Sequence, residues 1–182
     1  KFTGTVVVTG GTSGIGAALV GLLARSGWSV ITCGRGPARL KEVCAAHPGV
    51  VGHVVDLADP AATAAFADQI SLSADLIGLI NNAAGQQDVA LDRQPWADID
   101  REIRANFTAP AILTGRLLPA LVASGGFVVN ITSGLAIAPK SSAAVYCASK
   151  AALRNLTVGV RNQVRDTALR VIEVVMPLVE TP

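Results

Sequence analysis

The sequence Thr9-Gly10-Gly11-Thr12-Ser13-Gly14-Ile15-Gly16 follows the apolar stretch Thr5–Thr9 and leads into small residues at positions 17–19. Glycines at a junction between a strand and a helix let backbone amides come close to a pyrophosphate, and the helix N-terminus adds partial positive charge. The stretch therefore predicts a dinucleotide-binding turn. A tight turn without a ligand also needs glycines for its backbone angles, so that alternative stays open here.

Apolar stretches rich in β-branched residues recur along the chain, and these predict six strands: Thr5–Thr9, Ser29–Cys33, Val50–Val55, Leu76–Ile80, Phe127–Ile131 and Arg170–Val175. Stretches with helical spacing lie between them: Ile15–Arg25, Pro37–Ala46, Pro60–Ile70, Ala97–Ala123 and Ala143–Asp166. Strands of continuous apolarity are typical of a parallel sheet covered on both faces. The alternation predicts an α/β fold, a three-layer doubly wound parallel sheet, in one domain over residues 1–182.

Prolines indicate where some of these helices begin or bend. Asp59-Pro60 is typical of a helix start, because the carboxylate can accept hydrogen bonds from free amides and proline suits the first helical position. Pro110 and Pro119 lie within the fourth helical stretch, and we expect them to kink or shorten it.

Charge and hydropathy exclude two classes of partner. The 182 residues include 15 Lys+Arg and 13 Asp+Glu, a net charge of +2, with the basic residues scattered along the chain. Such a pattern lacks the basic stripe that nucleic-acid binding requires. Apolar residues make up 51% of the chain, yet no apolar run approaches the roughly 18 residues of a bilayer span. We therefore expect neither a nucleic-acid partner nor a membrane partner.

Cysteine usage and the first residues favour a cytoplasmic location. The three cysteines (Cys33, Cys44, Cys147) and two histidines (His47, His53) have neither a disulfide framework nor metal-ligand spacing, so no metal site is predicted. No charged leader with an apolar stretch precedes the first predicted strand. The first residue is Lys1, which leads us to expect a piece of a longer chain.

Residues after the second, third and fourth predicted strands suit a dinucleotide. Arg35 stands where an acidic residue would bind a free ribose 2′-hydroxyl, and its guanidinium favours the 2′-phosphate of NADP(H), although a solvated surface arginine is the alternative. Asp56 and Leu57 follow the third strand, where Asp56 either reaches an adenine ring or only braces the turn. Residues 81–85, Asn-Asn-Ala-Ala-Gly, are small enough for backbone to run against a cofactor.

Tyr146 is the single tyrosine of the chain, and Lys150 follows it by four residues in a helical stretch. One helical turn separates the two, so both side chains share a face. A phenol with an ordinary pKa near 10 is a poor base at neutral pH, but a nearby ammonium and a nicotinamide cation favour the phenolate. The pair therefore predicts a tyrosine that acts as a general acid and base.

Two further polar residues are candidates for the same site. Ser133 ends the fifth predicted strand, where its hydroxyl can hydrogen-bond a substrate carbonyl as negative charge builds on the oxygen. The neighbouring Thr132, or a plain turn made by the serine, is the alternative. Asn106 lies in a helical stretch, where asparagine is a poor helix former and is either held for a polar role or an ordinary surface residue.

Together these motifs resemble the short-chain dehydrogenase/reductase superfamily over essentially the whole chain. The resemblance rests on Thr9-Gly10-x-x-x-Gly14-Ile15-Gly16, Asn81-Asn82-Ala83-Ala84-Gly85, Asn106, Ser133 and Tyr146-x-x-x-Lys150. The stretches 133–136 and 145–152 look most like the DltE-like branch. The resemblance implies a Rossmann fold and an oxidoreductase that moves a hydride between NADP(H) and a small carbonyl or secondary alcohol substrate. A dinucleotide-binding sensor or scaffold without catalysis is the alternative.

The resemblance also implies a role for each candidate. Tyr146 would be the proton donor or acceptor, Lys150 would hold the nicotinamide ribose and lower the tyrosine pKa, and Ser133 would orient the carbonyl. Asn106 would hold a proton-relay water. The cofactor-binding residues would be Gly10, Thr12, Ser13, Gly14, Ile15, Gly16, Arg35, Asp56, Leu57, Asn82, Ala83, Tyr146, Lys150 and Thr181. Among them, Asp56 would contact the adenine, Asn82 the nicotinamide-side ribose and Thr181 the carboxamide.

Two departures from the family pattern stand out. The usual Asn-Asn-Ala-Gly carries an extra alanine at residues 81–85, so the assignment of its members is ambiguous by one. Family members also continue beyond the position of Pro182 with a lid, a further helix and a last strand, and we expect this sequence to lack them.

Assembly is predicted from the helix that carries Tyr146. Ala144, Ala148, Ala151 and Ala152 form a face of small residues, which suits close packing of a second chain or ordinary burial on the sheet. The family resemblance favours a homodimer or homotetramer.

Overall fold

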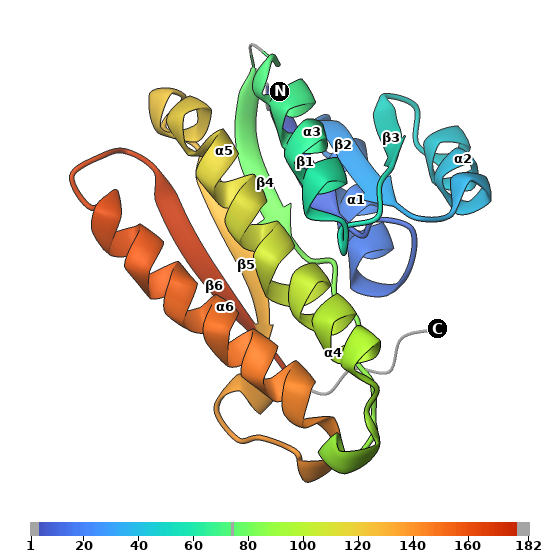
Figure 1. Cartoon of the computed structure of the whole chain (residues 1–182). Coiled ribbons are helices and arrows are strands. Elements are labelled where there is room, and N and C mark those ends of the chain that lie inside the picture. The colour runs from blue at the N-terminus through green and yellow to red at the C-terminus, as the bar shows by residue number, and fades with distance from the viewer. Residues whose placement is uncertain (1–3, 74, 178–182) are drawn as a thin grey trace.

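The computed structural model describes residues 4–73 and 75–177, and these form a six-stranded, fully parallel sheet (Figure 1). Its strands are β1 (Thr5–Thr9), β2 (Ser29–Gly34), β3 (Val50–Val54), β4 (Leu76–Asn81), β5 (Phe127–Ser133) and β6 (Arg170–Met176). The order β3-β2-β1-β4-β5-β6 shows that the chain adds strands outward from β1 on one side and then on the other. This confirms the doubly wound sheet, and its switch point between β1 and β4 is where such folds bind ligands.

Helices cover both faces of the sheet. One face carries α1 (Gly14–Arg25) and α2 (Pro37–Ala46), and the other carries α3 (Pro60–Ser71), α5 (Ala109–Ala123) and α6 (Ala144–Gln163). Figure 1 shows α3, α5 and α6 on the near face. The Asp59 carboxylate accepts hydrogen bonds from the amides of Ala61 and Ala62, which confirms the predicted start of α3. Within the described part of the chain, no helix has the length and apolarity to cross a bilayer.

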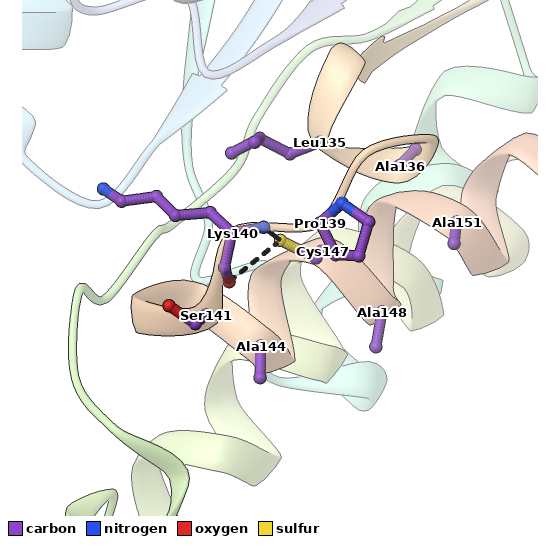
Figure 2. A pocket seen from close by; sticks show the side chains of 9 residues that line it. All are labelled: Leu135, Ala136, Pro139, Lys140, Ser141, Ala144, Cys147, Ala148 and Ala151. Carbon is purple, nitrogen blue, oxygen red and sulfur yellow. Dashed lines mark hydrogen bonds between the residues drawn. The ribbon is translucent and has the colours of Figure 1, made fainter.

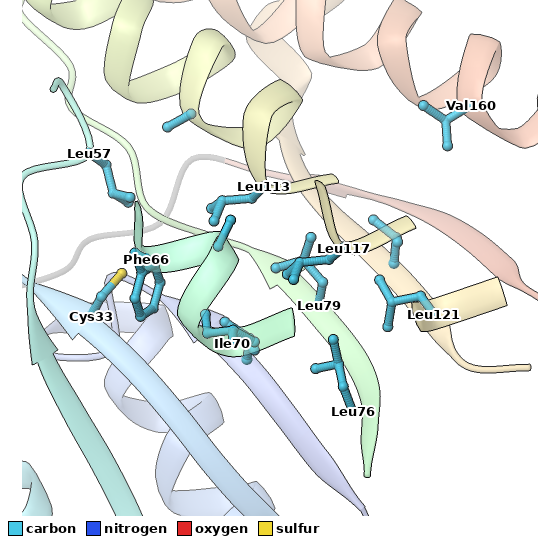
Figure 3. Close-up of a cluster of buried hydrophobic side chains, with 14 of the residues drawn as sticks. Cys33, Leu57, Phe66, Ile70, Leu76, Leu79, Leu113, Leu117, Leu121 and Val160 are labelled. Carbon is cyan, nitrogen blue, oxygen red and sulfur yellow. The ribbon is translucent and has the colours of Figure 1, made fainter. Parts of the chain in front are cut away.

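The larger of two apolar clusters lies under α3, α5 and α6 (Figure 3). Leu113, Leu117 and Leu121 recur every four residues along α5 and are fully buried against the sheet. Phe66 and Ile70 of α3 pack into the same cluster. Burying one such side chain stabilises a fold by about 1.5–3 kcal/mol, so this stripe fixes α5 firmly against β4 and β5.

The fourth helical stretch differs from the expected continuous helix over residues 97–123. It consists of α4 (Trp96–Ile103), a π-helical turn at Arg104–Thr108 and α5. Pro110 has no amide hydrogen to close an α-helical bond onto the Asn106 carbonyl, and the wider turn lies at this point. Pro119 does not end the helix, because the burial of the leucine stripe outweighs the roughly 3 kcal/mol that an internal proline costs.

The last predicted helix is also shorter than expected. It begins at Ala144, after a 3-10 turn at Ser141–Ala143, and ends at Gln163 rather than at Asp166. The 3-10 turn matters for the site because it joins α6 to the segment that follows β5. That segment, residues 134–143, contains a second 3-10 turn at Gly134–Ala136.

Candidate active site

A cleft of about 1110 Å³ lies at the carboxyl ends of the strands. It exceeds the roughly 300–1,000 Å³ of pockets for drug-sized ligands, so it has room for a dinucleotide and a small substrate together. The predicted residues that line it are Gly10, Thr12, Ser13, Gly14, Ile15, Gly16, Arg35, Asp56, Leu57, Asn82, Ala83, Ser133, Tyr146 and Lys150. Asn106 is not among its lining residues, and Thr181 lies outside the described residues.

The glycine-rich turn between β1 and α1 is packed too tightly for side chains. Gly10 and Gly14 have φ angles of +68° and +51°, which other residues rarely adopt. A Cβ on Gly16 would lie 2.2 Å from the Gly10 carbonyl oxygen. The N-cap Ser13 makes no side-chain hydrogen bond to the helix, so the first amides of α1 are not capped by it. The turn therefore fits a pyrophosphate, which binds such amides at a helix N-terminus.

Hydrogen bonds fix the switch point of the sheet. Thr9 Oγ1 accepts from the amides of Asn82 and Ala83, both at 3.0 Å, and Asn82 Nδ2 donates to the Thr9 carbonyl at 2.9 Å. Asn81 is buried on the other side of its strand, where its Nδ2 donates to Asn130 Oδ1 at 2.7 Å and to Thr114 Oγ1 at 3.2 Å. Of the two ambiguous asparagines, Asn82 thus lines the cleft and Asn81 stabilises the core.

Two contacts hold the Asp56 carboxylate in place. Its Oδ1 accepts from the Ala58 amide at 3.1 Å, and its Oδ2 pairs with Arg101 Nη2 at 2.9 Å. Burial raises the pKa of Asp56, but the Ala58 amide and the guanidinium groups of Arg101 and Arg35 outweigh it, so the pKa lies below its ordinary value. Arg101 reaches Asp56 from α4, and no local sequence pattern indicates a pair that is 45 residues apart.

Tyr146, Ser133 and Lys150 come together at the ends of β5 and α6. The Ser133 hydroxyl lies within hydrogen-bonding reach of the half-buried phenol, while Ser133 Oγ also accepts from the Leu135 amide at 3.1 Å. Lys150 Nζ lies 5.8 Å from the centroid of the Tyr146 ring and donates to the Ile131 carbonyl at 2.8 Å. Thr132, the alternative to Ser133, instead donates its hydroxyl to Glu173 Oε1 at 2.7 Å.

The pKa values of this group depend mainly on burial. Burial raises the pKa of Tyr146, the contact with Ser133 lowers it in part, and electrostatic interactions with the neighbouring Cys147 and Glu102 raise it further. Burial also lowers the pKa of Lys150 to about 8. We expected Lys150 to lower the pKa of Tyr146, but the protein's own side chains do not show this effect. Burial lowers the pKa of Lys150 itself, and its ammonium donates to the Ile131 carbonyl.

Asn106 lies in the π-helical turn and is fully buried. Its Oδ1 accepts from the Gly85 amide at 2.8 Å, and its Nδ2 donates to the Gly85 carbonyl at 2.8 Å and to Ser149 Oγ at 3.1 Å. Both Nδ2 hydrogens are used in these bonds. The side chain thus joins the loop after β4 to α6 three residues from Tyr146, and a water-holding role stays a prediction.

Two charged residues that sequence reasoning missed line the cleft near Tyr146. Glu102 of α4 is buried, and its Oε2 accepts from Gln94 Nε2 at 2.9 Å. Burial raises the pKa of Glu102 above its ordinary value, although contacts with the Gln94 side chain and the Gln87 amide oppose this. Lys140 lies in the segment 134–143, and its Nζ pairs with Asp88 Oδ1 at 3.0 Å. Neither residue belongs to a motif.

Residues 4–182 match the short chain dehydrogenase family. "Uncharacterized oxidoreductase DltE" of Bacillus subtilis is 37% identical, over 97% of this chain and 72% of its own length. "Serine 3-dehydrogenase" of Rhizobium radiobacter is 34% identical, over 98% of this chain and 73% of its own. "Sulfoacetaldehyde reductase 2" of Chromohalobacter salexigens is 31% identical, over 97% and 73%.

Solved structures of dehydrogenases are also similar to this chain. A short-chain dehydrogenase from Sphingobium yanoikuyae in complex with NADPH has a TM-score of 0.93 and 32% identity, over 98% of this chain and 72% of that protein. The closed form of a serine dehydrogenase complexed with NADP+ has a TM-score of 0.89 and 28% identity, over 97% and 73%.

Proposed function

Because the chain belongs to the short-chain dehydrogenase family, we propose that it is an NADP(H)-dependent oxidoreductase acting on a carbonyl or secondary alcohol, with Tyr146 as its general acid and base. The single observation that carries the proposal is the placement of Tyr146 beside Ser133 and Lys150 in the same cleft as the glycine turn. This juxtaposition supports acid–base chemistry next to a bound dinucleotide.

When bound, NADP(H) supplies or accepts the hydride. In the reducing direction, the Tyr146 hydroxyl donates its proton to the carbonyl oxygen as that oxygen gains negative charge. Ser133 donates a hydrogen bond to the same oxygen and orients the carbonyl. A phenol whose pKa is raised by burial is held protonated and ready to donate at neutral pH. In the oxidising direction, Tyr146 must be the phenolate to take the alcohol proton. Among the protein's own side chains Lys150 does not lower the phenol pKa, so its ammonium would favour the phenolate together with the positive charge of a bound oxidised nicotinamide.

The lining of the cleft supports a proposed set of cofactor-binding residues. Gly10, Thr12, Ser13, Gly14, Ile15 and Gly16 would hold the pyrophosphate, and Asp56 and Leu57 the adenine. Asn82 and Ala83 line the cleft and would lie along the nicotinamide-side ribose, which Lys150 would also hold. Arg35 is exposed at the end of β2, and its guanidinium would bind the 2′-phosphate, which supports NADP(H) over NAD(H).

A substrate screen follows from the relatives. Serine and sulfoacetaldehyde are the first compounds to test, because two relatives are named for them. 3-Hydroxybutyrate comes next, since a 32% identical protein of Rhizobium meliloti is named D-beta-hydroxybutyrate dehydrogenase. The readout is the change in NADPH absorbance.

The variant Tyr146→Phe tests the proposal. It removes the acidic hydroxyl but keeps the ring, so we expect turnover to fall by at least about 1,000-fold, while the Kd for NADPH, measured by fluorescence, changes less than about threefold. Cys44→Ser, a change in α2 far from the phenol, serves as the matched control and keeps full turnover. Undiminished turnover of Tyr146→Phe contradicts the assignment. NADPH binding without turnover of any compound by the unmodified protein supports the alternative of a non-catalytic binding module.

We also propose a homodimer or homotetramer that uses the exposed side of α6. Ala144, Ala148 and Ala151 line an apolar depression of about 530 Å³ there (Figure 2). Small residues allow close approach of a second helix. A light-scattering mass of a single chain at micromolar concentration contradicts this assembly.

We also propose that the protein is cytoplasmic. In the structure Cys33, Cys44 and Cys147 are free thiols, which a reducing compartment preserves. Fractionation of cells that express a tagged chain tests this location.

A further inference from the structure

We propose that Lys140 binds an acidic group of the substrate, a carboxylate or a sulfonate, so that the enzyme prefers small hydroxy acids and their oxo counterparts. The inference rests on the proposed function, because it concerns the substrate of the same cleft. It begins with the position of one cation relative to the catalytic tyrosine.

The backbone of Lys140 is tied to the residue next to Tyr146. The Lys140 amide donates to Cys147 Sγ at 3.3 Å, and the Cys147 thiol faces the Lys140 carbonyl at 3.8 Å. Figure 2 shows these two contacts and the side chain of Lys140 extending away from Cys147. The buried sulfur thus fixes where the lysine side chain begins, one residue from the phenol along α6.

The other basic side chains that line the described cleft are already engaged or lie elsewhere. Lys150 is buried and donates to a carbonyl, and Arg101 pairs with Asp56. Arg35 follows β2, at the end proposed for the adenine ribose. Lys140 remains as the accessible cation at the end of the cleft formed by Tyr146 and Ser133, with a side chain that is 43% exposed.

A substrate anion can replace Asp88 as the ion-pair partner of Lys140. Asp88 is 52% exposed and lies in the irregular segment that follows β4, so the ion pair is of the exposed kind that contributes little to stability. Gln86 Nε2 also donates to Asp88 Oδ1 at 3.0 Å. Asp88 therefore keeps a hydrogen-bond partner when Lys140 turns to a substrate anion, so breaking the ion pair costs little free energy.

The acidic residues near Tyr146 do not offer an equally accessible site for a cation. Glu102 lines the same cleft but is 5% exposed, and Gln94 already holds its carboxyl group. Asp98 of α4 also lines the cleft. If these carboxylates rather than Lys140 select the substrate, Lys140→Met should leave KM for the acid and the binding of malonate unchanged, which the test below measures.

The test compares acidic and neutral substrates with the full chain and NADP(H). 3-Hydroxybutyrate is paired with its methyl ester, and the variant Lys140→Met removes the charge but keeps much of the apolar stem. We expect KM for the acid to rise by about 10–100-fold with kcat within about threefold, and the constants for the ester to stay unchanged. Lys41→Met, an exposed lysine of α2, is the control and changes neither. Asp88→Asn removes the competing carboxylate, so KM for the acid should fall by about two- to fivefold.

A binding measurement makes the inference independent of turnover. Calorimetric titration of malonate into the protein saturated with NADP+ should show binding that Lys140→Met weakens by about tenfold or more, while Lys41→Met leaves it unchanged. If malonate and NADP+ bind in this way but no compound is turned over, the inference holds and the proposed function fails. If alcohols are oxidised but Lys140→Met changes neither the acid-to-ester ratio nor malonate binding, the proposed function holds and the inference is overturned.

Discussion

The two ends of the cleft are built in different ways. At the cofactor end, backbone packs against backbone, and the closest approach leaves 2.2 Å between the Gly10 oxygen and a Cβ added to Gly16. At the substrate end, residues 84–87 and 133–140 contribute the wall, and an exposed ion pair between Lys140 and Asp88 lies next to it. A Cβ added to Gly85 would meet nothing within 4 Å. The first end is therefore fixed by sterics, whereas the second can change its side chains without changing the fold.

This difference explains how one fold accommodates many substrates. A pyrophosphate needs free amides at a helix start, and only tight glycine packing leaves the backbone close enough to provide them. The substrate end has no comparable steric demand at Gly85, so a side chain can be added there without moving the backbone. We expect mutations at the cofactor end to disturb binding of the dinucleotide and stability together.

The largest expected effect comes from Gly16→Ala, which tests the steric claim directly. The added Cβ meets the Gly10 carbonyl and the Asn82 side chain, so the turn must shift. We expect NADPH affinity to fall by about 100-fold or more and the Tm to fall by about 5–10 °C. Fluorescence titration and thermal unfolding measure the two. Gly85→Ala at the other end is the matched change. If NADPH affinity and Tm fall equally in both variants, the two ends do not differ in their steric demand.

Arg35→Asp addresses the chemistry rather than the packing of the cofactor end. Loss of the guanidinium and gain of a carboxylate disfavour a 2′-phosphate and favour a free 2′-hydroxyl. The ratio of NADP(H) to NAD(H) affinity should fall by about 10–100-fold, with the Tm unchanged. Arg165→Asp, at an exposed position after α6, should leave the ratio as it is. An unchanged ratio in Arg35→Asp removes this residue from the phosphate site.

The smallest expected effect concerns the pH dependence of stability. The unfolded chain keeps the Lys150 proton up to about pH 10.5, whereas burial lowers the pKa to about 8 in the folded protein. The unfolded state therefore binds more protons between these values, and stability must increase as the pH rises through this window. We expect a gain of about 1 kcal/mol from pH 8 to pH 9 in urea unfolding.

The upper limit of pH 9 avoids a second buried group. Burial raises the pKa of the Cys33 thiol from 9.0 to about 11, so its contribution to stability is lost as the pH rises through that range. Lys150→Met should abolish the gain between pH 8 and pH 9, and a gain that persists in this variant assigns it to another group.

The sequence predicted most of the fold and most of the residues that line the glycine-turn end of the cleft. The β-branched stretches and their Gly, Asn or Pro boundaries placed the six strands to within two residues, because buried parallel strands leave a continuous apolar pattern. The turn between β1 and α1 could be predicted from the sequence because its close packing requires glycine. The alternation of side chains along β4 also indicates which of Asn81 and Asn82 is buried. Asn81 shares its face of the strand with the buried Leu79, so Asn82 is the one left for the cleft.

The remaining features depend on tertiary contacts that have no local signal. Pro110 indicated a break in the fourth helix, but the wide π turn around Asn106 reflects bonds to Gly85 and Ser149 from distant elements. The pairing of Lys140 with Asp88 joins residues 52 apart in the sequence. An isolated lysine or glutamate in a loop or helix is most often a surface residue, so neither Lys140 nor Glu102 could be singled out before the fold placed them in the cleft.

The most direct test of the account is a crystal structure of the protein with NADP+ bound. We expect the pyrophosphate on the amides of residues 14–16, the 2′-phosphate on Arg35, and the nicotinamide ring next to the Tyr146 hydroxyl and Ser133. A dinucleotide bound with its nicotinamide ring away from Tyr146, or bound outside the cleft, contradicts the account.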